Sequence, residues 1–366
     1  MRTVVISDLH LGSPRGNDVL RLEAPRQALL DELQRADRIV LLGDVVELRG
    51  APVADCLAAA RPLLGEIGAA ARDVPVVYVP GNHDHQLVAE WLELRRQRDE
   101  SSPLGLAQPL APGRSGLMAK VARALGAPGL EFSYPGVWLR PDVYATHGHY
   151  LDRHNSIPAV EVLAISVCAR ISGAQRSGPR KAEDYEAAAA PIYAFDYSIA
   201  QSGGPSRDAV RAGSSLRVWR KLNPQNGRMT PARVLLGGVL IPGVVAAVNR
   251  AGLGPFSSEL TPATLRRAAL DAMGEAVSRL EVDAEHVVFG HTHRAGPLAD
   301  DPRADGWATP GAPRLWNSGS WVHEQALVGS GARRSPYWPG GAVVLEDGGP
   351  PRLVNLLRDV PAEALR

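Results

Sequence analysis

Five short stretches of the chain combine carboxylate, imidazole and amide side chains with small, turn-forming residues. In chain order they are Asp8-Leu9-His10, Gly43-Asp44, Gly81-Asn82-His83-Asp84, His147-Gly148-His149 and Gly290-His291-Thr292-His293. Oxygen and imidazole ligands without thiolates suit Mn²⁺, Fe²⁺ or Zn²⁺. A surface turn could hold any one of these stretches without doing chemistry, so their interpretation depends on whether the chain brings them together.

Each of the five stretches follows an apolar run that predicts a buried strand. The runs are residues 3–6, 38–42, 74–79, 142–146 and 286–289. Helical patterns at 19–35 and 54–71 separate the first three, which is the alternation of an α/β architecture. In an open α/β sheet, functional side chains gather at the carboxyl ends of the strands. We therefore expect the five stretches to meet at one edge of a sheet.

Two of the stretches place their polar residues at positions i and i+2. Asp8 and His10 form one such pair, and His291 and His293 form the other. In an extended strand the side chains of i and i+2 share a face. Asp8 and His10 are therefore predicted to point the same way, as two ligands of one metal ion require, and His291 and His293 are predicted to share a face.

Length and composition bound the class of protein. A chain of 366 residues can bury a large core, either as one large domain with an insertion or as two domains. Its hydrophobic fraction of 45% and charged fraction of 22% are ordinary for a soluble globular protein. The formal net charge is only +1, so a nucleic-acid partner is not expected.

Cysteine usage and the N-terminus bear on the compartment. Cys56 and Cys168 are the only cysteines and lie far apart in apolar surroundings, which argues against a disulfide framework and a thiolate zinc site. The chain enters a predicted strand at once, without a charged segment followed by a long apolar one, so we expect no signal peptide. It also has no run of 18 or more apolar residues. A cytoplasmic location is expected.

Residues 151–285 interrupt the rhythm of strands. Helical patterns predominate there, at 158–171, 183–190 (ending at Pro191), 206–222 and 261–280. Residues 170–233 hold eleven Lys or Arg and five Asp or Glu, a local charge of +6, which leaves −5 for the remainder. We predict a core formed by 1–150 and 286–366 and a helical insertion formed by 151–285.

An apolar run at 234–248 lies inside this insertion. Its fifteen residues are too few for a spanning helix, which needs about 20. One interpretation is a buried helix pair that packs the insertion onto the main body. The other is a surface that enters a membrane interface or holds an acyl chain. The second interpretation predicts peripheral contact with the inner face of a membrane.

The remaining strand patterns predict further sheet. Residues 130–134 and 137–140 are interpreted as a hairpin that turns at Pro135-Gly136. Strand patterns in the tail are expected to complete a second sheet. They cover residues 314–317, 341–345 and 352–357.

Taken together, the five stretches resemble the signature of the calcineurin-like metallophosphoesterases. That signature runs D-x-H, G-D, G-N-H-D, a later H, and G-H-x-H, and it spans residues 3–293 of this chain apart from the insertion. The resemblance implies a four-layer α-β-β-α sandwich of two mixed sheets, of the α+β or α/β class, with the helical insertion as a lid. It also implies two divalent metal ions, with Mn²⁺ expected and Fe²⁺ or Zn²⁺ as alternatives.

The same resemblance implies a role for each site residue. One metal would be held by Asp8, His10, Asp44 and His293, and the other by Asp44, Asn82, His147 and His291. Asp44 would bridge the two ions, and a hydroxide between them would attack phosphorus. His83 would act on the leaving oxygen, with Asp84 orienting its imidazole. His149 would lie behind the ligands or contact the substrate.

The implied activity is hydrolysis of phosphate ester or pyrophosphate bonds. Residues 7–12 and 290–294 are similar to the branch that includes the UDP-2,3-diacylglucosamine pyrophosphatases, which implies a small, nucleotide-linked or lipid-linked substrate. A nuclease or cyclic-nucleotide phosphodiesterase of the same superfamily is an alternative, and a nuclease would need a basic groove bearing aromatic side chains. A non-catalytic, metal-bound interaction scaffold is a remote alternative. A scaffold would not need to keep both the complete set of ligands and the pair His83 and Asp84, and this chain has both.

Overall fold

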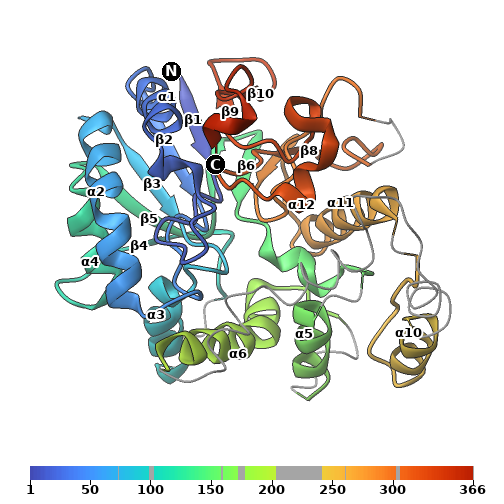
Figure 1. Cartoon of the computed structure of the whole chain (residues 1–366). Coiled ribbons are helices and arrows are strands. Elements are labelled where there is room, and N and C mark those ends of the chain that lie inside the picture. The colour runs from blue at the N-terminus through green and yellow to red at the C-terminus, as the bar shows by residue number, and fades with distance from the viewer. Residues whose placement is uncertain are drawn as a thin grey trace.

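The computed structural model describes residues 1–72, 74–98, 103–157, 160–171, 178–202, 241–259, 261–301 and 306–365. It is a mixed α/β protein whose strands belong to one large mixed sheet of ten strands, with helices on its outer faces (Figure 1). The strand order is β10-β9-β1-β2-β3-β5-β6-β7-β8, with β4 paired to β5.

The sheet contains two parallel groups. β1, β2 and β3 run parallel to one another, and so do β6, β7 and β8. The strands are β1 (Thr3–Ile6), β2 (Arg38–Leu42), β3 (Val76–Val79), β4 (Ala107–Leu110), β5 (Leu130–Arg140), β6 (Val143–Thr146), β7 (His286–Phe289), β8 (Arg314–Asn317), β9 (Gly341–Leu345) and β10 (Arg352–Asn355). All five signature stretches therefore follow strands of these two groups.

The expected pair of separate sheets is wrong, because β5 belongs to both halves. Its first residues pair with β3 and its last residues, from Gly136 on, pair with β6. The expected hairpin at Pro135-Gly136 is wrong for the same reason, since the strand continues through these residues. A Cβ on Gly136 would collide with the Tyr144 hydroxyl and the Ala145 carbonyl. The glycine there serves a close approach of two strands rather than a turn.

Helices cover the sheet on both sides. They are α1 (Glu23–Leu33), α2 (Val53–Ala71), α3 (Gln86–Gln97), α4 (Gly116–Leu125), α5 (Val160–Ile171), α6 (Ala182–Gln201), α10 (Ile241–Arg250), α11 (Pro262–Arg279) and α12 (Gln325–Val328). Short 3₁₀ turns lie at η1 (Val19–Arg21), η2 (His149–Arg153), η5 (Gly329–Arg334) and η6 (Ala362–Leu365). The helical pattern expected at 19–35 is divided between η1 and α1, and α3 was not predicted.

Three apolar clusters hold these layers together. The first lies between β1–β3 and the helices around them, with Ile39 and Leu64 fully buried. The second lies between the two halves of the sheet and includes Val40 and Val137. The third joins α11 to β6 and β7 and includes Met273. The carboxyl ends of the strands are thus supported from both faces.

The helices α5, α6 and α10 lie together along one side of the sheet, at the bottom of Figure 1. Contrary to expectation, α6 does not end at Pro191. Its Ala188 and Tyr193 belong to one buried apolar cluster with Ile165 of α5, so tertiary packing on either side of the proline sustains the helix. The pattern expected at 206–222 lies outside the described residues.

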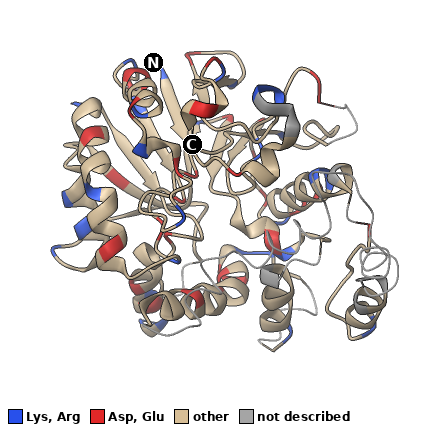
Figure 2. Cartoon of the chain, viewed as in Figure 1, with Lys and Arg blue, Asp and Glu red and all other residues tan. Residues whose placement is uncertain are grey.

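The apolar run at 234–248 is described from residue 241, where α10 begins. Val245 of α10 packs with Val162 of α5 and with Phe256 in a small buried cluster. No described helix is both long and apolar enough to cross a membrane. Acidic and basic side chains are interspersed on α1, α2, α3 and α11, whereas α6 carries acidic side chains alone and α4 and α10 carry basic ones alone (Figure 2).

Candidate metal centre

The loops that follow β1, β2, β3, β6 and β7 bring the predicted ligands together. Three groups of ligand atoms, each group within 4.8 Å, occur here among the described residues. They are Asp8–His10–His293, His10–Asp44–His83 and Asp44–His147–His291. Because the groups share His10 and Asp44, they form one continuous cluster with room for two ions. Asn82 lies beside the third group.

The ligands converge by a route that differs from the one expected. Asp8, His10, Asp44, His291 and His293 have φ angles between 48° and 64°. The alternation of an extended strand therefore does not extend to these residues, and the i, i+2 argument is wrong. Left-handed backbone costs an ordinary residue about 1 kcal/mol or more, and such residues cluster at functional sites. Five of the seven non-glycine residues with this conformation in the described chain lie here.

Two glycines make room for the ligands. A Cβ on Gly43, whose φ is 81°, would collide with the His147 ring. A Cβ on Gly290 would collide with the carboxylate of Asp8 and the hydroxyl of Ser7. Only glycine lets these loops approach one another so closely.

The second group of ligands surrounds the amide of Asn82. Its Oδ1 lies 3.2 Å from His147 Nε2 and 3.1 Å from His291 Nδ1. Asp44 Oδ2 also lies 3.2 Å from His147 Nε2. Rotating the amide would let its nitrogen donate to these atoms and its oxygen accept from Arg49 at 2.9 Å. We assign the unrotated amide, in which Asn82 Oδ1 faces His147 Nε2 and His291 Nδ1. In this orientation all three atoms point an unshared electron pair at the same place, as the ligands of a metal ion do.

The first group shows the same convergence of lone pairs. His10 Nε2 lies 3.1 Å from His293 Nε2, and His293 Nε2 lies 3.3 Å from Asp8 Oδ1. His10 Nε2 is 3.8 Å from Asp44 Oδ2, which places Asp44 between the two groups. Asp44 therefore lies within reach of the ligand atoms of both groups.

Acceptors outside the cluster fix the orientation of three imidazoles. His10 Nδ1 lies 3.1 Å from Glu47, His147 Nδ1 lies 2.9 Å from the Leu42 carbonyl, and His291 Nε2 lies 3.0 Å from Asp152. Each ring donates its N–H outward, so its other nitrogen turns an unshared pair toward the centre. Two such nitrogens cannot bond to each other, whereas a divalent cation would satisfy both. The residues present therefore fit a dinuclear divalent metal site.

The charges of the cluster favour a cation. Burial raises the pKa of Asp44, but His147 and His83 outweigh it and hold that pKa well below its ordinary value. Burial lowers the pKa of His147, but Asp44 raises it to about 10. Without metal, a proton on His147 thus compensates the buried carboxylates. Metal binding must compete with that proton.

The partner expected for His83 is wrong. His83 Nδ1 lies 2.9 Å and 2.8 Å from the two carboxylate oxygens of Glu47, and its ring stands edge-on to His10. Asp84 instead accepts hydrogen bonds from the Tyr78 hydroxyl and from the backbone N–H groups of Gly81 and Val45. The side chains of His83 and Asp84 therefore point in different directions. Asp84 connects the loop after β3 to the loop after β2, and Glu47 orients His83.

Glu47 is one of three residues around the site that sequence reasoning missed. It lies three residues after Asp44, where only the acid directly after the strand had been considered. Its carboxylate is buried, and burial raises its pKa, but His83 and His10 hold the pKa well below the usual range. An acid flanked by apolar residues, as in Val46-Glu47-Leu48, was the available signal.

Arg49 and Asp152 were missed as well. The guanidinium of Arg49 forms an ion pair with Asp196 of α6 and lies 5.5 Å from the Tyr193 ring centre. It therefore links the loop after β2 to the insertion. Asp152 belongs to η2, close after the fourth signature stretch, and accepts the outer N–H of His291. No pattern in the sequence marked either residue.

His149 belongs to a second buried group, which we name the Glu186 cluster. It comprises Glu186 of α6 with His85, Tyr134, His149 and Tyr150. His149 Nε2 lies 3.3 Å from the Tyr134 hydroxyl. Burial, followed by the charge of His147, lowers the pKa of His149 well below its ordinary value, so the ring is neutral. His149 therefore packs behind His147 rather than facing solvent.

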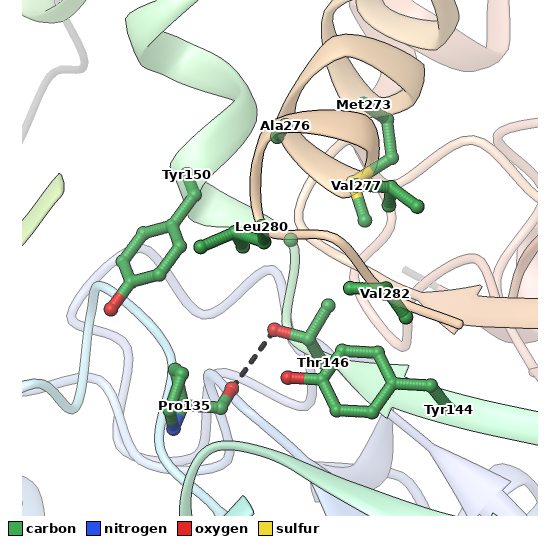
Figure 3. Close-up of a pocket in the computed structure, with 10 residues that line it drawn as sticks. Pro135, Tyr144, Thr146, Tyr150, Met273, Ala276, Val277, Leu280 and Val282 are labelled. Atoms are coloured by element: carbon green, nitrogen blue, oxygen red, sulfur yellow. Dashed lines mark hydrogen bonds between the residues drawn. The ribbon is translucent and has the colours of Figure 1, made fainter. Parts of the chain in front are cut away.

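The fourth signature stretch is buttressed by α11. Figure 3 shows a small apolar pocket that is lined by Tyr150 and Thr146 and, from α11, by Met273 and Val277. The Thr146 hydroxyl donates a hydrogen bond to the Pro135 carbonyl at 2.9 Å. The turn that carries His147 is thus held from β5 and from α11.

The cluster is open on one side. Asp8, Asp44 and His147 are at most 1% exposed, whereas the side chains of His83 and His293 are 30% and 22% exposed. A substrate would reach the metal ions from the side of these two histidines.

Comparison with known proteins agrees with this geometry. Residues 1–166, which include Asp8 through His147, match a family model described as calcineurin-like phosphoesterase. No curated protein matches the chain. A solved structure of a cold-active protein-tyrosine phosphatase from a psychrophilic Shewanella species is 14% identical, with 94% of this chain and 75% of that chain covered. Its TM-score of 0.31 is too low to support an argument.

The family match ends before His291 and His293, but the structure brings both into the same cluster as the matched ligands. The structure thus adds two ligands that lie beyond the matched residues. Residues 1–166 are thus similar to the calcineurin-like phosphoesterases, and with its buried His/Asp clusters the chain is a metal-dependent phosphoesterase.

Proposed function

We propose that the chain hydrolyses phosphate ester or pyrophosphate bonds at a dinuclear metal centre. Asp8, His10 and His293 would hold one ion, and Asn82, His147 and His291 the other, with Asp44 shared. The observation that carries this proposal is the convergence of lone pairs from imidazoles whose outer N–H groups are already engaged. We propose Mn²⁺ as the metal, with Fe²⁺ and Zn²⁺ as alternatives to be compared.

When bound, two divalent ions activate water and neutralise charge on the phosphoryl group. His83 is the side chain placed to act on the leaving group. Glu47 engages its Nδ1, so Nε2 is the nitrogen left to face a substrate. We propose that Nε2 delivers the proton to the leaving oxygen, an effect worth about 10²–10⁴-fold in rate. Glu47 acts as a positioning residue for both His83 and His10.

We further propose that the substrate is small or lipid-linked and that the insertion meets its apolar part. Val167 and Ile171 of α5 and Phe195 of α6 expose 40%, 81% and 63% of their surface. Large apolar side chains exposed on neighbouring helices support contact with an acyl chain or a membrane interface. The proposed location is cytoplasmic, with peripheral contact at the inner face of the membrane.

The test is a hydrolysis panel with Mn²⁺, Fe²⁺ and Zn²⁺. It contains a phosphomonoester, a phosphodiester, a cyclic nucleotide, single-stranded DNA, a nucleotide pyrophosphate and a nucleotide-linked lipid. Turnover of an ester or pyrophosphate is expected. No turnover of any compound with any of the metals would refute the proposal, and a preference for DNA or cyclic nucleotide would favour the alternative activities.

His83→Ala tests the proposed acid. We expect kcat to fall about 10²–10⁴-fold while the metal content stays that of the wild type. His286→Gln is the matched control, since His286 lies at the start of β7, away from the cluster. Wild-type turnover by His83→Ala would show that His83 has no role in the chemistry.

A variant with Val167→Ser, Ile171→Ser and Phe195→Ser tests the lipid-linked substrate. We expect slower turnover of the nucleotide-linked lipid and unchanged turnover of a soluble ester. Equal loss on both substrates would assign these side chains to the stability of the insertion.

A further inference from the structure

A groove of about 500 Å³ lies along β10, the strand at one edge of the sheet, and we name it the β10 groove. One wall is the loop from Ala295 to Asp300, which follows the fifth signature stretch. The opposite walls are the segment from Arg333 to Pro336 and the strand β10 with Arg358. Its volume falls within the range of small-molecule sites, which is about 300–1,000 Å³.

Hydrogen bonds connect these walls before any ligand is present. The N–H of Ala295 donates to the Pro336 carbonyl at 2.8 Å. The amide of Asn355 donates to the Trp338 carbonyl at 3.3 Å, and the Trp338 indole donates to the Leu357 carbonyl at 2.9 Å. The groove is therefore preformed, which reduces the ordering cost of binding.

The rim of the groove carries excess positive charge. Arg333, Arg334 and Arg358 line it and are exposed, and Asp300 is the acid among the lining residues. No ion pair joins these arginines to any described residue, and the neighbouring Asp301 is engaged by Arg294 at 2.7 Å. The rim thus has a local charge of about +2, matching a phosphate monoester, whose charge is about −1.5 to −2 at pH 7.

The remaining lining is apolar. Pro297, Leu298, Pro336 and Leu353 are partly exposed in the groove. Guanidinium groups bind phosphate oxygens in bidentate fashion, while these side chains offer apolar surface to the rest of a ligand. An inorganic anion would leave that surface uncovered.

We propose that the β10 groove is a second binding site, independent of the metal ions, for an organic phosphate. Its phosphate lies on Arg333, Arg334 and Arg358, and its apolar part lies on Leu298 and Leu353. The site goes beyond the proposed hydrolysis, because none of its lining residues belongs to the groups of predicted metal ligands.

The test is calorimetric titration of the metal-loaded full chain with phenylphosphonate, whose C–P bond resists hydrolysis. Two molecules are expected per chain, one at the metal centre and one in the groove. The variants Arg333→Ser/Arg334→Ser and Arg358→Ser should weaken the groove event at least about tenfold, because charged hydrogen bonds are lost. Arg123→Ser, which removes an exposed arginine from α4, is the matched control and should change neither event.

Two further measurements separate this proposal from the proposed hydrolysis. Asp44→Asn should remove the metal-centre event and leave the groove event, and groove variants should hydrolyse a small chromogenic ester at the wild-type rate. Inorganic phosphate should bind the groove about tenfold more weakly than phenylphosphonate, since it covers no apolar surface. If the groove variants leave every binding event unchanged, or if both anions bind the groove equally well, the proposal is wrong.

Discussion

The metal centre and the Glu186 cluster are both buried groups of histidine and carboxylate, and they meet at His147-Gly148-His149. They differ in how hydrogen-bond donors and acceptors are matched. Glu186 accepts from the hydroxyls of Tyr134 and Tyr150 and from His85 Nε2 at 2.8 Å. In the metal centre, lone pairs face lone pairs, as between His10 and His293 at 3.1 Å.

This difference separates a structural polar cluster from a site for metal. A buried acid surrounded by donors is satisfied by the protein alone, so nothing further needs to bind. A group of acceptors without donors is stable only with protons or cations between them. Both clusters combine histidine with a buried carboxylate, so the presence of these two residue types alone does not distinguish them. The following predictions test the distinction, from the largest expected effect to the smallest.

Asp44→Asn should have the largest effect, because it removes charge from the one carboxylate that both ion sites share. We expect loss of bound metal and a fall in kcat of about 10³-fold or more, since metal ions supply several kcal/mol of transition-state stabilisation. Metal content by mass spectrometry and turnover with Mn²⁺ measure the two effects. Glu186→Gln should keep its metal, and metal loss in both variants would mean that the clusters are not distinct.

Glu47→Gln should have an intermediate effect, because Glu47 touches no predicted ion but orients His10 and His83. Loss of such an outer partner typically lowers metal affinity or activity about 10–100-fold. We expect weaker Mn²⁺ binding together with a lower kcat at saturating Mn²⁺. Full recovery of kcat by excess metal would show that Glu47 supports the ligand His10 and does not position His83.

Glu186→Gln should act on stability in a pH-dependent way. Burial raises the pKa of Glu186, but His85 outweighs it, so the pKa falls from an ordinary 4.5 to about 2. A lowered folded-state pKa stabilises the protein above about pH 4.5, and this stability is lost as the pH falls toward 2. The shift corresponds to roughly 3 kcal/mol.

Urea unfolding of the wild type and Glu186→Gln at pH 7 and at pH 3 measures this effect. The wild type should be more stable at pH 7, and the difference should shrink at pH 3. A difference that does not change with pH would mean that the charge of Glu186 is not what holds α6 to the core.

Asp196→Asn should have the smallest effect. Its ion pair with Arg49 is partly exposed, and such pairs contribute about 1 kcal/mol or less. We expect a small fall in the free energy of unfolding and little change in metal content. A large fall in metal content would show that the insertion controls the metal centre through Arg49.

Much of the site was predictable, because the signature residues follow strands whose ends the apolar runs mark. The bounds of β1, β2 and β7 agree with the sequence patterns, and the structure brings the predicted ligands together. The continuous β5 was not predictable in the same way, because glycine signals both turns and close strand contacts. The partner of His83 is Glu47 rather than Asp84 because of the conformation of the loops after β2 and β3, and the sequence pattern does not specify that conformation.

The same limit applies to the helices. A proline predicts a helix end from local chemistry, yet α6 continues past Pro191 because Tyr193 packs against α5. The predicted insertion at 151–285 and the possible lipid contact of 234–248 stay predictions. Residues 203–240, which make up much of both segments, lie outside the described part of the chain.

The left-handed backbone of five predicted ligands implies a trade-off between stability and activity. Glycine adopts this conformation without the penalty that aspartate or histidine carries. Replacing His293 by glycine would relieve that penalty while removing a ligand, so it is expected to stabilise the metal-free fold and impair the enzyme. Selection for thermal stability alone would therefore tend to replace ligands such as His293 by glycine. Selection for activity keeps the ligands in place.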